Sequence, residues 1–75
     1  MAVAYITGGA TGIGAAAVRK FAAAAFDVAV FDINQAAVEA LAAEGHEGAI
    51  HFFRTDVSDR PAVRQATAAA NKKLG

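Results

Sequence analysis

The stretch TGGATGIG, Thr7 to Gly14, holds four glycines in eight residues and directly follows the apolar run AVAYI. Glycine loses more conformational freedom on folding than any other residue, and it has no side chain to pack. A cluster of glycines therefore indicates a tight turn, or a place where another group comes close to the backbone. Because apolar residues recur with helical spacing after Gly14, we expect a strand, a glycine turn and a helix in that order.

Two further apolar segments resemble the one before the glycines. The three predicted strands are VAYI (Val3–Ile6), VAVF (Val28–Phe31) and AIHFF (Ala49–Phe53). The first two are continuously apolar, as expected for strands of a parallel sheet that is covered on both faces. Each gap between strands is long enough for a crossover helix. The pattern predicts an α/β, Rossmann-like three-layer fold of the form β-α-β-α-β-α, with parallel strand order 3-2-1.

Helical periodicity predicts which residues of each helix face the sheet. The first helix is expected to bury a face formed by Ile13, Ala17, Phe21 and Ala24. The second is expected to begin after the N-cap Asn34 and to end before Gly45 at the C′ position. Its apolar stripe is Val38, Leu41 and Ala42. The third is expected to begin after Ser58 as N-cap and to bury Val63, Ala66, Ala70 and Leu74.

Composition narrows the class of protein. The chain has 75 residues, 56% of them hydrophobic and 19% charged, which excludes a disordered segment. The formal net charge is zero, so neither nucleic acid nor an anionic membrane is expected as a partner. Cysteine is absent, and His46 and His51 have no second ligand at metal spacing, so no metal site is expected. With no secretory-type N-terminus and no long apolar run, the expected location is the cytoplasm.

Two acidic residues stand at the ends of the second and third strands. A glycine turn that leads into a helix exposes backbone N–H groups, which suit a phosphate. Asp32 lies 18 residues after Gly14, close to the offset of about 20 residues at which an acid binds a ribose hydroxyl. Asp56 follows the third strand. Since no Lys-Ser/Thr pair follows Gly14, a phosphate loop for nucleoside triphosphates is excluded and a dinucleotide is preferred.

These motifs together resemble the short-chain dehydrogenase/reductase family. The pattern Thr7-Gly8-x-x-x-Gly12-x-Gly14, the segment VFDIN (Val30–Asn34) and the segment DVSD (Asp56–Asp59) stand at the family's spacing. The resemblance implies that Gly8 and Gly12 shape the turn and that the backbone near Thr11, Ile13 and Gly14 approaches ribose and pyrophosphate. It also implies that Asp32 accepts hydrogen bonds from the adenosine ribose. The implied cofactor site comprises Gly8, Thr11, Gly12, Ile13, Gly14, Asp32, Ile33, Asp56 and Val57.

The resemblance also bears on the cofactor. The 2′-phosphate of NADP would meet the carboxylate of Asp32 as like charge against like charge. Members that accept NADP usually carry Arg or Lys in the glycine loop or just after the second strand, where this chain has Thr11 and Ile33. We therefore expect NAD(H). Asp56 and Val57 would border the adenine, with Asp56 near its amino group.

The family's catalytic residues have no counterpart in the chain. The only tyrosine, Tyr5, lies inside the first strand, where we expect it to be part of the core, and the residue four later is Gly9 rather than lysine. The expectation is that residues 1–75 are the N-terminal half of a Rossmann domain without the catalytic half, and that they are inactive alone. The parent oxidoreductase would transfer hydride between NAD(H) and an alcohol or carbonyl substrate. The alternative is a non-catalytic nucleotide-binding module, or a fragment that complements another chain.

Two further expectations come from the resemblance. The complete protein is expected to be a homo-oligomer, as family members commonly are. Family members also commonly have a glycine at the turn before the second strand, where this chain has Ala25. If Ala25 adopts the left-handed conformation there, it carries a strain on the order of 1 kcal/mol.

Overall fold

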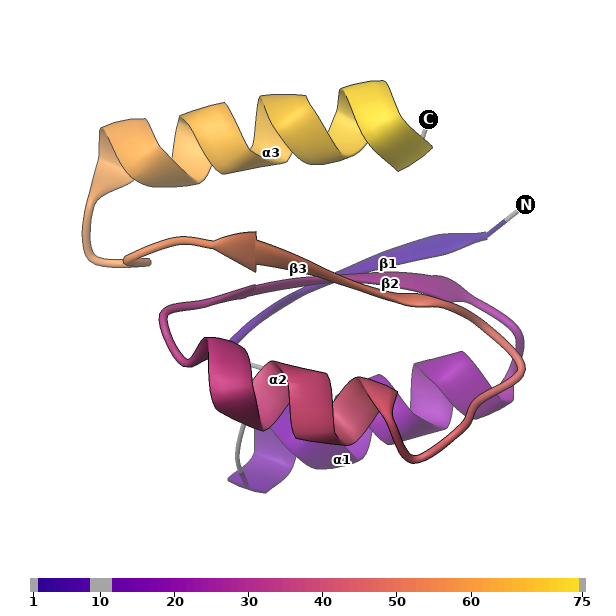
Figure 1. Ribbon diagram of the computed structural model, residues 1–75. Coiled ribbons are helices and arrows are strands. Elements are labelled where there is room, and N and C mark those ends of the chain that lie inside the picture. The colour runs from indigo at the N-terminus through magenta and orange to yellow at the C-terminus, as the bar shows by residue number, and fades with distance from the viewer. Residues whose placement is uncertain (1, 9–11, 75) are drawn as a thin grey trace.

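The computed structural model describes residues 2–8 and 12–74. It confirms the predicted order of elements (Figure 1). The six elements are β1 (Val3–Thr7), α1 (Gly12–Ala23), β2 (Asp27–Asp32), α2 (Gln35–Ala42), β3 (Ile50–Arg54) and α3 (Arg60–Leu74). Each strand differs from its predicted bounds by one residue at one end or at both ends.

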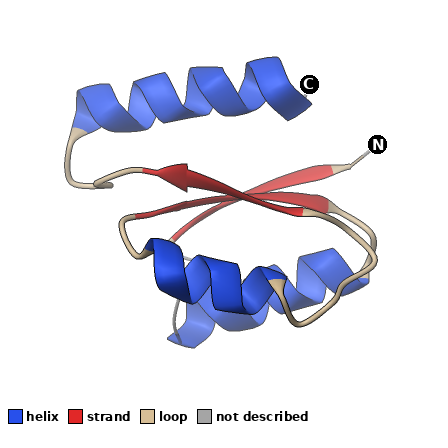
Figure 2. Cartoon of the chain, viewed as in Figure 1, coloured by secondary structure: helices blue, strands red, loops and turns tan. Residues whose placement is uncertain are grey.

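The three strands form one parallel sheet in the order β1-β2-β3, which is the predicted order 3-2-1 read from the other edge. In the register, Val3 pairs with Asp27, and Val28 pairs with Ile50. Helices α1 and α2 cover one face of the sheet and α3 covers the other (Figures 1 and 2). All three strands run in the same direction, so their carboxyl ends meet at one edge of the fold, at the left of Figure 1.

The central strand β2 divides the core in two. Val28 and Val30 are fully buried on the face covered by α1 and α2, together with Val38 and Leu41. On the other face, Ala29 and Phe31 pack against α3, where Ala70 is fully buried. Successive side chains of a strand point to opposite faces, so a continuously apolar strand supplies both cores. The stripes predicted for α2 and α3 are confirmed at Val38, Leu41, Ala66, Ala70 and Leu74. Ala42, also predicted for the stripe of α2, is exposed instead.

The predicted buried face of α1 is wrong. The helix buries Ala15, Val18 and Ala22, whereas Ile13 is 91% exposed and Phe21 39% exposed. The prediction followed the larger apolar side chains, but small residues let the helix lie close to the sheet. Phe21 instead packs edge-to-face on Phe26, with ring centroids 5.1 Å apart.

The helix caps agree only in part with the sequence-based expectation. Asn34 caps α2, because its Oδ1 accepts a hydrogen bond of 3.1 Å from the backbone N–H of Ala37. Gly45 has the expected positive φ of 82°, but it lies two residues after the C-cap Ala43. The expectation for Ser58 is wrong. Asp59 caps α3, because its Oδ1 accepts from the N–H of Ala62 at 3.2 Å.

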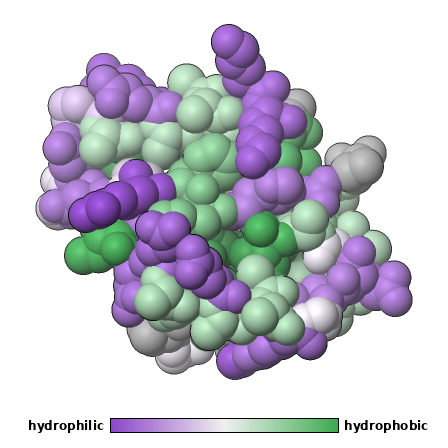
Figure 3. All heavy atoms as spheres, viewed as in Figure 1, coloured by the Kyte–Doolittle hydropathy of each residue, from purple (hydrophilic) through white to green (hydrophobic). Residues whose placement is uncertain are grey.

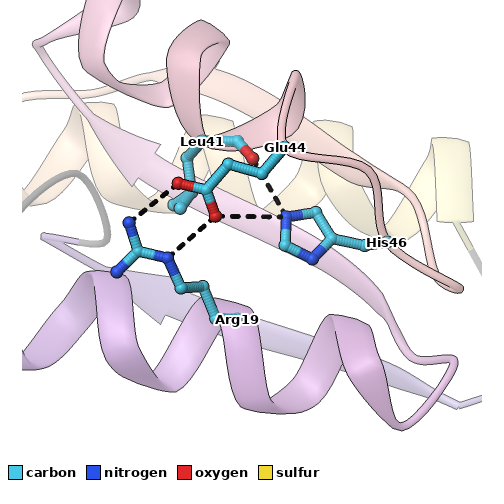
Figure 4. A network of polar contacts seen from close by, with 4 residues as sticks. All are labelled: Arg19, Leu41, Glu44 and His46. Atoms are coloured by element: carbon cyan, nitrogen blue, oxygen red, sulfur yellow. Dashed lines mark hydrogen bonds and ion pairs between the residues drawn. The ribbon is translucent and has the colours of Figure 1, made fainter.

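A small polar cluster joins α1 to the loop after α2 (Figure 4). The guanidinium of Arg19 donates two hydrogen bonds, of 2.9 and 2.8 Å, to the two carboxylate oxygens of Glu44. The His46 Nε2 lies 3.0 Å from the carbonyl oxygen of Leu41 and 3.9 Å from Glu44. The pKa of Glu44 is lowered, and the hydrogen bond from Arg19 is the largest cause. These contacts give Arg19 and His46 structural roles.

No helix in residues 2–8 and 12–74 is both long enough and apolar enough to cross a membrane.

Candidate functional site

A small pocket of about 100 Å³ opens at the carboxyl ends of the strands. Its lining comes from three separate junctions between a strand and the segment after it: Gly8, Phe31, Asp32, Ile33, Thr55, Asp56 and Val57. Five of the nine residues predicted for the site lie in this lining, namely Gly8, Asp32, Ile33, Asp56 and Val57. The parallel sheet therefore brings together residues that are up to 49 positions apart in the sequence.

Backbone hydrogen bonds extend the sheet to the rim of this pocket. The N–H of Gly8 donates to the carbonyl of Phe31, and the N–H of Thr55 donates to the carbonyl of Asp32, each at 3.0 Å. Thr55 is only 3% exposed, and its hydroxyl donates to the carbonyl of Phe53 at 2.9 Å. These bonds fix the chain segments that carry Asp32 and Asp56, so both acids are placed by the sheet.

The two acids share one local geometry. In each, Oδ1 accepts a hydrogen bond of 3.0 Å from the backbone N–H two residues later, which belongs to Asn34 for Asp32 and to Ser58 for Asp56. Asp56 also accepts a bond of 2.6 Å from the Ser58 hydroxyl. The pKa of Asp56 is lowered, mainly by the hydrogen bond from the Ser58 hydroxyl and to a smaller extent by the bond from the Ser58 N–H. Hydrogen bonds to a carboxylate favour its charged form, so Asp56 is an anionic acceptor at neutral pH.

Large apolar side chains are exposed beside these acids. Ile33 is 64% exposed and Val57 is 50% exposed, and both line the pocket. Ile13, in the first turn of α1, is 91% exposed. Figure 3 shows strongly apolar atoms projecting between polar ones at the left of the view, the side where the strands end in Figure 1. Apolar side chains next to hydrogen-bond acceptors suit a flat, partly apolar ligand that carries several donors.

Two glycines of the turn, Gly8 and Gly12, have a left-handed backbone conformation. Gly8 has φ +65° and Gly12 has φ +58°. A Cβ atom added at either position would meet no described atom within 4 Å, so glycine is required there for its backbone conformation and open space adjoins it. Helix α1 begins at Gly12, and Ile13 and Gly14 lie in its first turn. Thr11, also predicted for the site, lies outside the described residues.

Tyr5, whose catalytic role the sequence analysis rejected, lies outside the pocket. Tyr5 is 39% exposed rather than part of the core, and its hydroxyl donates to Oδ1 of Asn71 on α3. Across the described ranges, no group of three or more His, Cys, Asp or Glu side chains could hold a metal ion. Larger hollows lie beside Gly45 and along α3, and they are more open than the pocket.

Besides Phe31, which lines the pocket and was not predicted for the site, sequence reasoning missed two features. The first is Thr55, which forms part of the lining. Its position between the third strand and Asp56 could have indicated this, because a polar residue there lies next to a site acid. The second feature is the bond from the Ser58 hydroxyl to Asp56. A serine just before a helix is most often a cap, so the sequence favoured that role. Asp59 one residue later competes for the cap, and this could have pointed to another role for Ser58.

Comparison with known proteins gives one consistent result. The family model described as short chain dehydrogenase matches residues 2–75. The D-threitol dehydrogenase of Mycolicibacterium smegmatis is 40% identical over 75 residues, which are 97% of this chain and 29% of that protein. The 2,5-dichloro-2,5-cyclohexadiene-1,4-diol dehydrogenase of Sphingobium indicum is 39% identical over 75 residues, 97% of this chain and 30% of that protein. The chain thus spans about three tenths of the length of these relatives.

The fold also matches solved structures. An alcohol dehydrogenase from the archaeon Thermococcus sibiricus, complexed with 5-hydroxy-NADP, superposes with a TM-score of 0.92 at 27% sequence identity. The match covers 100% of this chain and 33% of that one.

Proposed function

The chain belongs to the short-chain dehydrogenase family, and on that premise we propose that residues 1–75 are the N-terminal half of a dinucleotide-binding domain. This half binds the adenosine and pyrophosphate of NAD(H). The observation that carries the proposal is the pocket in which Asp32 and Asp56 lie beside the exposed Ile33 and Val57. Adenosine has the matching chemistry, because it combines a flat base with an amino donor and ribose hydroxyl donors.

Each part of the pocket has a role in this proposal. The Asp32 carboxylate accepts from the ribose hydroxyls, and the adenine lies between Ile33 and Val57 with its amino group toward Asp56. The pyrophosphate lies over the turn from Gly8 to Gly14, where N–H groups at the start of α1 favour an anion. The open space at Gly8 and Gly12 supports this placement.

We propose NAD rather than NADP as the cofactor. The family includes proteins that bind NADP-type cofactors, as the complex of the Thermococcus sibiricus enzyme shows. In this chain a 2′-phosphate would approach the Asp32 carboxyl, and the neighbouring pocket residue is the uncharged Ile33. Like charges this close disfavour binding of the phosphate.

A cofactor titration tests the proposal. We expect the chain to bind NAD more tightly than NADP by isothermal titration calorimetry. Asp32→Asn should weaken NAD binding about tenfold, since the ribose hydroxyls then donate to a neutral amide oxygen instead of a carboxylate. It should also reduce the ratio of the affinities for NAD and NADP. Asp27→Asn is the matched control, because Asp27 lies at the opposite end of β2 and the change in net charge is the same. Tighter binding of NADP by the unaltered chain would refute the cofactor assignment.

The parent enzyme, in this proposal, acts on an alcohol or a carbonyl compound. Bound nicotinamide supplies the hydride acceptor or donor for such a carbon, and the relatives named above are dehydrogenases. The one tyrosine is held in β1 by its bond to Asn71, so the chain has no tyrosine placed for proton transfer at the pocket. We therefore expect no oxidation of NADH by the 75-residue chain with carbonyl substrates. Measurable turnover, absent from a mock purification, would show that the chain contains catalytic residues.

A second candidate function is a binding module that works by complementing another chain. The observation that favours it is coverage, since the chain spans 29% of the D-threitol dehydrogenase. If the chain shows no heat with NAD at about millimolar concentration but binds once the remaining part of a relative is added, complementation is the better description.

A further inference from the structure

Ser58 is free of the capping role that its position in the sequence suggests. Asp59 accepts the hydrogen bond from the Ala62 N–H that an N-cap side chain would take. The Ser58 hydroxyl instead donates to Oδ1 of Asp56 at 2.6 Å, and the Ser58 N–H donates to the same oxygen at 3.0 Å. Ser58 therefore makes two bonds to one atom of a residue that lines the pocket.

The other pocket acid provides an internal comparison. At Asp32, the residue two positions later also donates its N–H to Oδ1. Its side chain, however, is used elsewhere, because Oδ1 of Asn34 caps α2 at the N–H of Ala37. The side-chain bond at Asp56 is thus an addition to a turn geometry that both acids already have. The turn itself is closed by a backbone bond of 2.9 Å from Asp59 N–H to the Asp56 carbonyl.

Two donors on Oδ1 restrict the rotation of the Asp56 carboxylate. In the described part of the chain, the two bonds to this carboxylate both fall on Oδ1, so Oδ2 is the oxygen that remains for a donor of the ligand. A fixed acceptor binds a donor better than a rotating one, because less side-chain freedom is lost on binding. The lowered pKa of Asp56 keeps the acceptor ionised.

We propose that Ser58 is a positioning residue that orients the Asp56 carboxylate toward the 6-amino group of the bound purine. This inference rests on the proposed function. A 6-amino group donates hydrogen bonds, whereas the 6-oxo group of hypoxanthine is an acceptor and is repelled by a carboxylate. Ser58 thereby strengthens the preference of the pocket for adenine nucleotides, although it does not touch the nucleotide itself.

The test compares NAD with nicotinamide hypoxanthine dinucleotide, in which a 6-oxo group and an N1–H replace the 6-amino group and the unprotonated N1 of adenine. Ser58→Ala should weaken NAD binding about fivefold, the cost of fixing one additional side chain, and leave the hypoxanthine analogue unchanged. Ser58→Thr keeps the hydroxyl and should restore NAD binding. Thr67→Ala is the matched control, since it removes a hydroxyl bonded to the Val63 carbonyl on α3, outside the pocket, and should alter neither affinity.

The outcomes separate this inference from the proposed function. If the unaltered chain binds neither dinucleotide, the proposed function and the inference both fail. If it binds NAD, and Ser58→Ala weakens both dinucleotides equally or neither of them, only the role of Ser58 is refuted. A carbon NMR titration of the Asp56 carboxyl provides a readout without ligand. Its pKa should rise in Ser58→Ala and return in Ser58→Thr, and an unchanged pKa in Ser58→Ala would overturn the inference.

Discussion

Ala25 has a backbone conformation that its own side chain opposes. Its φ is +67°, and it is the one residue other than glycine with positive φ among the described positions. The Cβ atom of an L-residue is crowded by the following carbonyl in this region, at a cost of about 1 kcal/mol or more. The chain accepts this cost because the turn must reverse direction between α1 and β2, where the Ala25 N–H donates to the Ala22 carbonyl at 3.1 Å.

Ala25→Gly should therefore stabilise the chain by about 0.5–1 kcal/mol, since relief of the strain exceeds the added entropy of the unfolded state. Urea denaturation measures this as a higher midpoint with an unchanged slope. Ala16→Gly is the opposite control. Ala16 is exposed within α1, so glycine there should destabilise by about 1 kcal/mol. Equal destabilisation by both substitutions would contradict the strain at Ala25.

At the scale of elements, two contacts link α1 to the loop after α2: the Arg19–Glu44 ion pair, and a backbone bond of 2.9 Å from the Gly48 N–H to the Ala22 carbonyl. Arg19 lowers the pKa of Glu44 through its hydrogen bonds and then its charge. An acid with a lowered folded-state pKa stabilises the fold fully above its unfolded-state pKa, near 4.5 for Glu44. This stabilisation is lost as the pH falls through the lowered folded-state value.

Glu44→Gln should therefore reduce stability at about pH 6 more than at about pH 3. Urea denaturation of both proteins at the two pH values measures the difference, and Asp56, which also has a lowered pKa, contributes equally to both. The control is Glu47→Gln, which changes an exposed acid in the same loop. It should not reduce stability more at about pH 6 than at about pH 3. Parallel pH profiles for the original chain and Glu44→Gln would show that the pair does not stabilise the fold.

The elements differ in how well the sequence predicts them. The continuously apolar β2 and the crossover spacing indicate a parallel sheet, because strands covered on both faces need apolar residues throughout. The acids that follow the strands then come together at one edge, which is why most of the pocket was foreseen. The buried face of α1 could not be predicted in this way, because close packing of the helix on the sheet selects Ala15 and Ala22 over the larger Ile13 and Phe21. The cap of α3 was also missed, because Ser58 and Asp59 are both good capping residues and only the geometry decides between them.

At the scale of the whole molecule, β2 has a neighbour on each side and β1 has one. Within residues 2–8 and 12–74, β1 pairs only with β2. The Asp27 N–H donates to the Ala2 carbonyl, and the Gly8 N–H donates to the Phe31 carbonyl. Since the direction of the backbone groups alternates along a parallel strand, the N–H and C=O groups of Val3, Tyr5 and Thr7 point away from β2. This edge of the sheet carries no charged side chain.

An uncharged sheet edge with unpaired backbone groups favours pairing with another strand. We therefore expect the 75-residue chain to self-associate at concentrations of roughly 100 μM, as measured by light scattering after size-exclusion chromatography. Val3→Lys places a charge on the edge and should shift the chain toward monomer. Ala16→Lys is the matched control, because it changes the net charge equally on the exposed face of α1. If pairing at the β1 edge causes the association, only Val3→Lys should reduce it. An equal reduction by both substitutions would show that net charge, and not the β1 edge, governs the association.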